Sequence, residues 1–572
     1  MEIQTLTPEE DKLSLEEFVK LETTVDFQAI ASDRFLRYAA ARPFIHLGTR
    51  LANDYIVAYT NEIYIPSIYR ELGGDLLIFT PKILSPVDSA SNEAAGITRV
   101  LAQPFLDLTG QNVIIGVIDT GIEFSDSAFR FEDGSSKLLS LWDQSLDGER
   151  RGNVYFGSTY DRGQIDQLLQ SEPPPSPFPG EDMDGHGTFI ASVAAGNTGD
   201  KYIGAAPGAS IIAVKLRRAR PYYIQRYLLN RDDPNLFESS DFLLGMKYIL
   251  DKSTEFDMPV VILIGMGSNT AAHDGNSLFE DYISFISSRE GCAVVCAAGN
   301  EANARHHTAG SVRNGGEEKI NIKVGSGGVS FGTIIFTPAF DKISVSVTSP
   351  TGEIMARKPF RAGAEYTEKL ILESTVITLR YSRDTNNTVW VGLDRATEGI
   401  WEITIFGDEI VSGSYQAWLP ISGQADSGIE FLRPVSEYTI VYPATAAKNI
   451  VSGAYNSFDG SLLVSSSWGP TRQGKPAPDL TAPGVQVEGI YPEGYGSMTG
   501  TSVSAAVTAG AAALMLEWGI LKGNMPNMNG ELIRNLFIGG ARRESNLSYP
   551  NNKWGYGKLN LYGTFEYLIN RQ

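Results

Sequence analysis

Four polar residues of this chain could take part in acid–base and nucleophilic chemistry: Asp119, His186, Asn300 and Ser502. Asp119 ends the apolar run VIIGVID, and the carboxyl ends of buried parallel strands are where α/β folds place their sites. His186 is the only one of five histidines that stands between two glycines, at the start of an expected helix. Flanking glycines let a backbone approach another surface closely. A carboxylate and an imidazole in these contexts favour general-base chemistry.

Ser502 supplies a candidate nucleophile. It follows Gly500 and Thr501 and opens a long Ala- and Gly-rich helix. The unpaired N–H groups and the dipole at a helix N-terminus favour a developing oxyanion. Asn300, in AAGNEA at the end of another buried strand, carries a side-chain N–H that could donate to the same oxyanion. These residues therefore indicate attack on a carbonyl group.

Each of the four residues also has a purely structural interpretation. The aspartate and the asparagine could serve turns, the serine could cap its helix, and a lone histidine is more often structural than catalytic. Their order, their glycine contexts and their positions after apolar runs agree with one another, which favours the joint functional interpretation.

Strands alternating with helices are expected to position these residues. The runs VIIGVID, SIIAVKL, VVILIGM and GCAVVCAAG are nearly continuous in apolar residues, as parallel strands buried on both faces require. GTFIASVAAG and SSDFLLGMKYILDKS, which lie between them, are expected to be helices. This alternation predicts a three-layer α/β domain with a parallel sheet, in two blocks, 91–316 and 435–572.

Two further domains are expected. Between residues 317 and 434 the helical pattern stops and eight short strands follow in succession, which predicts an inserted all-β jelly roll or sandwich. Residues 1–90 form a small α+β unit, with a strand at 54–59, a helix ending at Gly73–Gly74 and a strand at 76–84. The small, polar segment 85–96 is typical of a linker or a cleavage site.

Composition excludes several classes of function. The chain has 572 residues and a formal charge of −20, which argues against nucleic acid as a partner. It shows neither a secretory signal nor an apolar run approaching 18 residues, so we expect neither export by a cleaved leader nor a transmembrane segment. Cys292 and Cys296 are the only cysteines; about 13 Å apart along one strand, they cannot pair. A reducing cytoplasmic or spore compartment is expected.

The order Asp, His, Asn, Ser with its flanking motifs resembles the subtilisin-like serine proteases, or subtilases. The motifs are DTG at Asp119, DGHGT at His186, AAGN at Asn300 and GTSVSAA at Ser502. The β insertion, the stretch 129–145 and the missing leader further resemble the Csp germination proteases of clostridia. The chain departs from the family at Ala506, where proline is usual, and at LIGMGS, where SLG is usual.

The resemblance implies a cofactor-free serine endopeptidase with an Asp119–His186–Ser502 triad. Asn300 and the Ser502 N–H would form the oxyanion hole, and Gly265, Met266 and Gly267 would line the substrate cleft. Residues 1–90 would be a pro-domain, cut once between Ser85 and Gly96 and then retained. No metal is expected, since no DxDxDG-type loop is found.

The resemblance also implies a protein substrate, a zymogen of a cortex hydrolase activated in spore germination. A general intracellular or surface subtilase and a pseudoprotease that binds signals remain alternatives. The β insertion could instead bind carbohydrate through Trp390, Trp401 and Trp418, although core packing is the more common use of tryptophan in alternating strands.

Overall fold

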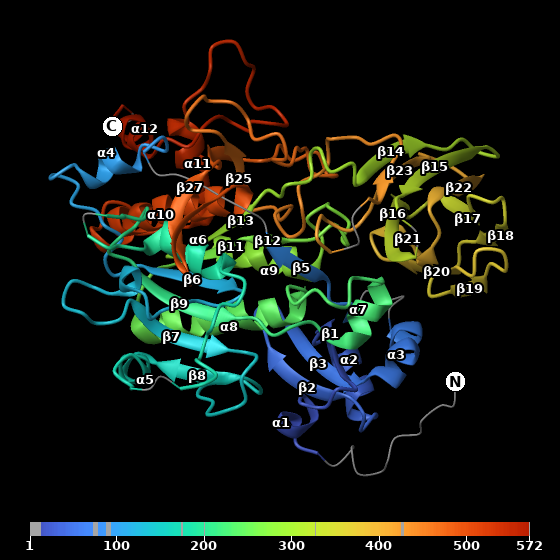
Figure 1. Cartoon of the computed structure of the whole chain (residues 1–572), viewed down its shortest axis with the longest axis horizontal. Coiled ribbons are helices and arrows are strands. Elements are labelled where there is room, and N and C mark those ends of the chain that lie inside the picture. Colours follow the sequence, from blue (N-terminus) through green and yellow to red (C-terminus); the bar gives the residue numbers. More distant parts are fainter. Residues whose placement is uncertain are drawn as a thin grey trace.

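The computed structural model describes residues 13–72, 78–86, 93–172, 175–199, 201–326, 328–424 and 428–570. Figure 1 shows three units: an N-terminal unit in blue, a central α/β unit, and a β-sandwich drawn mainly in yellow and orange. The central unit is built from two stretches of chain, one before and one after the sandwich in the sequence. The N-terminal unit lies against both of the other units.

An eight-stranded sheet forms the middle of the central unit, in the order β26-β25-β13-β11-β6-β9-β7-β8. Seven strands are parallel, and only the edge strand β8 runs antiparallel. The expected parallel sheet is confirmed. The strands are β6 (Ile114–Asp119), β7 (Leu138–Asp143), β8 (Ser158–Asp161), β9 (Ser210–Lys215), β11 (Val260–Ile264), β13 (Cys292–Ala297), β25 (Ile450–Tyr455) and β26 (Leu480–Pro483).

Helices cover both faces of this sheet, because its strands are apolar on both sides. In β6, Ile115 and Val117 pack into one core, and Ile114 and Ile118 pack into the other. The first face carries α6 (His186–Ala195), α10 (Thr501–Leu516) and α11 (Gly530–Gly540), while the second carries α8 (Ser239–Phe256) and α9 (Leu278–Ser287). Smaller helices are α4 (Ile97–Leu101), α5 (Arg162–Leu168), α7 (Pro221–Tyr227) and α12 (Leu561–Ile569).

Helix α10 runs through the first core. All sixteen of its residues are buried, and a methyl group added at Gly510 would lie 2.3 Å from Cβ of Ala205. Together with the π-helical turn η5 (Glu517–Leu521), α10 is long and apolar enough to cross a membrane, but 89% of its apolar window is buried inside the protein. No other helix in the described ranges meets that criterion.

The N-terminal unit is an antiparallel sheet in the order β2-β3-β1-β4, with helices packed on it. The expected strand at 76–84 is split: β4 stays in this sheet, while β5 pairs with the central unit. Pro81 stands between them and has no N–H to continue a ladder. Residues 73–77, with the expected helix end at Gly73–Gly74, lie outside the described residues. The elements are α1 (Leu15–Phe18), β1 (Thr24–Ile30), α2 (Asp33–Ala40), β2 (His46–Arg50), β3 (Tyr55–Asn61), η2 (Glu62–Tyr64), α3 (Ile65–Leu72), β4 (Ile78–Phe79) and β5 (Ile83–Pro86).

The sandwich consists of two antiparallel sheets that enclose one core. Trp401 is fully buried, Trp418 is 1% exposed and Trp390 is 7% exposed, so these tryptophans form no bare strip for a sugar. One sheet contains β14 (His307–Ser311), β23 (Ser414–Trp418), β16 (Val329–Pro338), β21 (Asn386–Ala396), β20 (Val376–Arg383) and β19 (Glu365–Lys369). The other contains β18 (Ile354–Pro359), β17 (Lys342–Thr348), β22 (Gly399–Glu409), β15 (Glu317–Val324) and β24 (Glu430–Phe431).

The eight strands expected from sequence correspond to β15, β16, β17 and β19 to β23, and β14, β18 and β24 are additional. The expected strand EKLILES ends early, at Lys369. Ile371 and Leu372 are 82% and 74% exposed in the turn that follows. Their backbone N–H groups donate to the Glu353 carboxylate at 2.7 and 2.9 Å, which holds them outside the ladder.

Candidate active site

Three strands that are neighbours in the sheet end at the same edge. The order β13-β11-β6 places Asn300, Gly265 and Asp119 beyond the carboxyl ends of adjacent parallel strands. His186 and Ser502 open the two helices that cover the first face, α6 and α10. The sheet order therefore brings together residues that are far apart along the chain.

The structure brings Asp119, His186 and Ser502 into direct contact. Nδ1 of His186 lies 2.7 Å from Oδ1 of Asp119, and Nε2 lies 3.1 Å from Oγ of Ser502. Their exposed fractions are 1%, 4% and 0%, in the order Asp119, His186, Ser502. An imidazole that donates from Nδ1 to the carboxylate leaves Nε2 as the acceptor for the serine proton. The described chain thus holds an acid–imidazole–hydroxyl relay shielded from water.

Glycine makes this approach of helix and strand possible. A methyl group added at Gly187 would lie 2.2 Å from the carbonyl oxygen of Gly121 and 3.0 Å from Cβ of Asp119. Gly185, which precedes the helix, has φ of 87°, a conformation that side-chain-bearing residues rarely adopt. The glycines on either side of His186 therefore have separate roles: one turns the chain, and the other lets the helix reach β6.

A second carboxylate, Asp182, supports the first, and sequence reasoning missed it. Its Oδ1 accepts from Thr120 Oγ1 at 2.7 Å and from the Gly185 N–H at 2.9 Å, and its Oδ2 accepts from both the backbone and the hydroxyl of Thr188. Thr120 in turn donates its N–H to Asp119 at 2.8 Å. The available signal was a carboxylate just ahead of a helix start, which is too common to single out a site.

Burial raises the pKa of Asp119 above its usual value, although the neighbouring His186 and the Thr120 N–H act to lower it. Oδ2 of Asp119 is buried and makes no hydrogen bond in the described structure. The carboxylate is thus held in a weakly solvating site in which the imidazole is its main partner. Such a site strengthens the attraction to an imidazolium when one forms.

Asn300 is oriented by the start of α10. Its Oδ1 accepts the Thr501 N–H at 3.1 Å, and the Gly299 N–H donates to Thr501 Oγ1 at 3.0 Å. Among the hydrogen bonds of the described residues, none uses the Nδ2 donors of Asn300. The Ser502 N–H belongs to the first turn of α10, where N–H groups lack intrahelical partners. A side-chain amide and the backbone N–H of Ser502 are the kinds of donor that a developing oxyanion requires.

The segment Gly265–Gly267 lies beside this relay. A methyl group at Gly265 would meet Cε1 of His186 at 3.1 Å and Cβ of Ser502 at 3.2 Å. β12 (Met266–Gly267) pairs antiparallel with β5 of the N-terminal unit, Gly267 opposite Ser85 and Met266 opposite Pro86. On its other side, β5 pairs with β10 (Phe237–Glu238). An extended segment of the chain itself therefore lies along β12, where the resemblance places the substrate cleft. The expected cut at 85–96 falls partly on residues 87–92, which lie outside the described residues.

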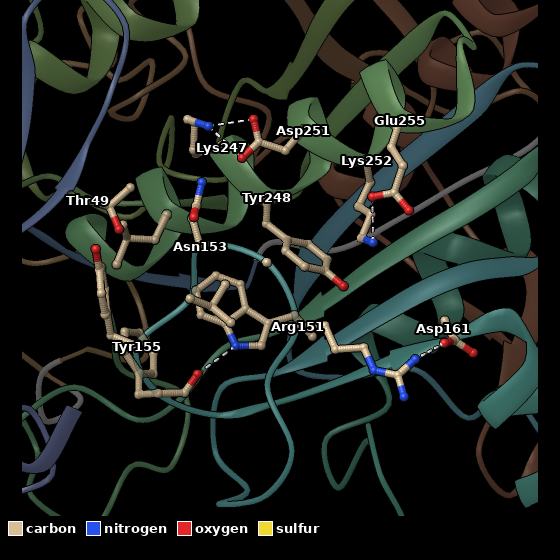
Figure 2. Close-up of a pocket in the computed structure, with 15 residues that line it drawn as sticks. Thr49, Arg151, Asn153, Tyr155, Asp161, Lys247, Tyr248, Asp251, Lys252 and Glu255 are labelled. Atoms are coloured by element: carbon tan, nitrogen blue, oxygen red, sulfur yellow. Dashed lines mark hydrogen bonds and ion pairs between the residues drawn. The ribbon is translucent and has the colours of Figure 1, made fainter.

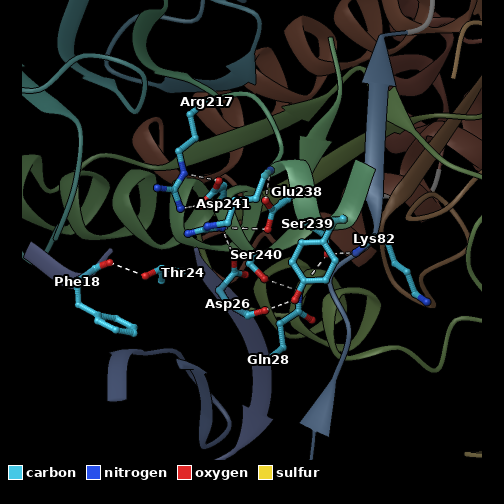
Figure 3. Close-up of polar contacts among 12 residues, drawn as sticks. Phe18, Thr24, Asp26, Gln28, Lys82, Arg217, Glu238, Ser239, Ser240 and Asp241 are labelled. Carbon is cyan, nitrogen blue, oxygen red and sulfur yellow. Dashed lines mark hydrogen bonds and ion pairs between the residues drawn. The ribbon is translucent and has the colours of Figure 1, made fainter. Parts of the chain in front are cut away.

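A buried polar cluster joins the N-terminal unit to the wall of this cleft (Figure 3). Nη1 of Arg220 donates to Oδ1 of Asp26 in β1 and, at 3.0 Å, to Oε2 of Glu238 in β10. Nε2 of Gln28 donates to the hydroxyls of Ser239 and Ser240 at 3.0 and 3.2 Å. Both Asp26 and Glu238 are fully buried. The N-terminal unit is thus held by charges out of contact with water.

A cavity of about 500 Å³ lies elsewhere, against residues 244–255 of α8 (Figure 2). Its charged residues pair with one another: Lys247 with Asp251, Lys252 with Glu255, and Arg151 with Asp161. None of the relay residues lines it. Within the described ranges, no group of three His, Cys, Asp or Glu side chains is placed to hold a metal ion.

Comparisons with known proteins give a consistent result. A family model described as the subtilase family matches residues 110–329 and 429–557. Subtilisin E of Bacillus subtilis (strain 168) is 33% identical over 124 residues, 22% of this chain and 28% of that protein. The PII-type proteinase of Lacticaseibacillus paracasei is 22% identical over 505 residues, 79% of this chain and 25% of that protein. These alignments span less than a third of either relative.

A solved structure is similar over most of the chain. The Clostridium perfringens CspB protease matches with a TM-score of 0.74 and 30% identity, covering 84% of this chain and 98% of that one. The unmatched stretch between the two family segments falls within the β-sandwich. These findings agree with the resemblance drawn from the short motifs.

Proposed function

The chain belongs to the subtilase family, and on that premise we propose that it is a serine endopeptidase whose triad is Asp119, His186 and Ser502. The observation that carries the proposal is the pair of contacts at His186, 2.7 Å to the carboxylate and 3.1 Å to the hydroxyl. A complete, buried relay favours an enzyme over a signal-binding scaffold on the same fold.

The geometry supports a defined order of proton movements. Oγ of Ser502 attacks a peptide carbonyl carbon while its proton passes to Nε2 of His186. Asp119 stabilises the imidazolium and holds the ring in the required tautomer. The oxyanion receives hydrogen bonds from the Ser502 N–H and the Asn300 side chain. His186 then protonates the leaving amine, and water attacks the acyl-enzyme along the same route.

The N-terminal unit is proposed to be a pro-domain that the enzyme removes from itself. Its last described strand, β5, runs along β12 toward Gly265, the residue beside Ser502. Because Gly267 faces Ser85 and Met266 faces Pro86, the residue after Pro86 is the one expected to supply the attacked carbonyl. We therefore expect the cut between residues 87 and 88.

The test is the intact mass of purified wild-type and Ser502→Ala protein. The wild type should give fragments of about 10 and about 52 kDa from a chain of 62.2 kDa, whereas Ser502→Ala should stay whole. Ser504→Ala is the matched control, because Ser504 is also buried in α10 and donates to Ala482 and Pro483 carbonyls. A Ser502→Ala chain that still cuts itself, or a cut far from residue 87, would contradict the assignment.

We further propose that the cut pro-domain stays bound and that the protease activates a cortex-hydrolase zymogen inside a spore. The buried Asp26–Arg220–Glu238 contact supports retention, and the likeness to the CspB protease supports the spore setting. Incubating the cleaved protein with such a zymogen tests the role: cleavage by wild type but not by Ser502→Ala is expected. Hydrolysis of unrelated proteins alone would favour a general subtilase, and failure of a serine-directed probe to label Ser502 would favour a pseudoprotease.

A further inference from the structure

The candidate cleft has two walls, and both are glycine-rich. One wall is the segment Gly265–Gly267, and the other is Ala298–Asn300, which follows β13. In the proposed reaction the attacked carbonyl lies between Ser502 and Asn300. The side chain of that substrate residue, called here the acyl-side residue, must therefore enter the gap between the two walls.

Val441 fills this gap. A methyl group added at Gly267 would lie 2.3 Å from Cγ2 of Val441, and one added at Gly299 would lie 2.5 Å from its Cγ1. The valine is 1% exposed. Its two methyl groups thus touch the backbone of both walls at once, and both walls need glycine there because of it.

The position of Val441 is fixed by hydrogen bonds to each wall. Its N–H donates to the Ala298 carbonyl at 2.9 Å. The next residue, Tyr442, exchanges N–H and carbonyl with Ser268, both bonds being 2.9 Å. The valine cannot swing away without breaking these bonds, so a bulky substrate side chain cannot displace it at low cost.

The acidic residue that follows the second wall, Glu301, is also engaged. Oε2 of Glu301 lies 2.7 Å from Nδ1 of His306, and its Oε1 accepts the N–H and hydroxyl of Ser422 from the sandwich. Glu301 is 3% exposed. Its carboxylate points to these partners, so the cleft offers a basic side chain no free charge at this place.

We propose that Val441 sets the substrate class of this enzyme, restricting the acyl-side residue to side chains no larger than valine and excluding aromatic, long aliphatic and basic ones. The inference rests on the proposed function and makes it more specific. The chain's own sequence is consistent with it, since valine stands at the position after Pro86. A side chain one methylene too large for such a pocket typically costs a factor of about 10 to 200 in kcat/KM.

The experiment compares peptides that differ only in the acyl-side residue, Ala, Val, Leu, Phe or Lys, with wild type, Val441→Gly and Val441→Ala. Wild type should cleave the Ala peptide at least about 100-fold faster than the Phe peptide, as kcat/KM. Val441→Gly should raise kcat/KM for the Phe peptide at least about tenfold, which lowers the ratio of the Ala-peptide value to the Phe-peptide value. Val441→Ala should give an intermediate ratio. Val451→Ala, a buried valine of β25, controls for a general loss of packing and should keep the wild-type ratio.

The two hypotheses fail in different ways. A wild-type enzyme that cleaves Phe and Ala peptides equally, or a folded Val441→Gly variant with an unchanged ratio, overturns the role of Val441 while leaving the protease intact. A wild-type chain that does not cut itself in the intact-mass test overturns the proposed function, and the inference with it.

Discussion

The charges that hold the N-terminal unit predict how its release depends on pH. The cluster contains two carboxylates, Asp26 and Glu238, for one guanidinium, Arg220. The adjacent pair of Arg217 and Asp241 is already neutral, with contacts of 2.7 and 2.9 Å. Two negative charges and one positive charge without water leave one negative charge uncompensated, and a bound proton removes it.

The proton is expected on Glu238. Burial and the charge of Asp26 raise the pKa of Glu238 well above its usual value. Burial also acts to raise the pKa of Asp26, but the attraction of Arg220 outweighs it and lowers that pKa. The tyrosines that face the cluster, Tyr59 and Tyr223, stay neutral because burial raises their pKa values. Assembly of the two units therefore takes up one proton at Glu238.

The sign and size of the effect follow from this proton. A group whose pKa is raised in the assembled state stabilises assembly below its ordinary pKa, near 4.3, and loses that contribution as pH rises toward the raised value. The loss is about 1.4 kcal/mol, or tenfold in affinity, per pH unit. The lowered pKa of Asp26 affects the affinity of the two units only below about pH 4. From pH 5 upward, binding should weaken about tenfold per unit until Glu238 ionises.

The assay uses the Ser502→Ala chain with residues 87–92 replaced by a recognition sequence for a sequence-specific protease. After cleavage at that sequence, the dissociation constant of the N-terminal unit is measured between pH 5 and pH 8. Asp26→Asn should remove most of the slope, because Glu238 then pairs one-to-one with Arg220. Asp33→Asn, on the exposed side of α2, is the matched control and should keep the wild-type slope. A flat wild-type profile, tighter binding at higher pH, or an unchanged slope in Asp26→Asn would refute the reasoning.

Four further outcomes are expected. Asn300→Ala should lower kcat about 10²- to 10³-fold with little change in KM, as measured with a peptide substrate; an unchanged kcat would remove its oxyanion role. Gly187→Ala should destabilise the fold by about 1–3 kcal/mol in urea unfolding, since its methyl group would meet the Gly121 carbonyl, and wild-type stability would contradict that packing. Trp401→Ala should cost about 3–5 kcal/mol, a loss that an exposed tryptophan would not show. Cys296, whose pKa burial raises to about 12, should resist thiol reagents until the chain unfolds, and rapid labelling of the native protein would refute this.

Much of the fold could be predicted because its strands carry local signals. The apolar run ending at Asp119 indicated a strand buried on both faces, and β6 is that strand. One of the eight short strands expected between residues 317 and 434 is β17, at 342–348, although its burial does not alternate, because Ser344 and Ser346 are buried as well. The two cysteines were expected in one strand without a bond, and both are free and buried in β13. Such signals work because side-chain periodicity depends only on the backbone conformation of a few neighbouring residues.

The residues that sequence reasoning missed have no local signal. Asp182 is one carboxylate in an acidic loop, Val441 is one valine in an apolar run, and Asp26 alternates with apolar neighbours in β1 like any surface residue. The expected strand at 76–84 is divided at Pro81; its second part, β5, pairs with β12, in agreement with the resemblance, which implies that the end of the pro-domain passes through the active site. Each of these residues acquires its role from a partner that belongs to another unit or a distant strand.

The amino-acid sequence by itself determined the types of element, the glycines that permit close contact, and the four residues able to do chemistry. Tertiary structure alone decided that His186 reaches both Asp119 and Ser502, that the chain's own β5 pairs with β12, and that Val441 lies against both Gly267 and Gly299. The physical reason is that distances between remote residues depend on the order of strands in a sheet and on which surfaces exclude water. Those are properties of the whole packed chain, and no short stretch of it contains them.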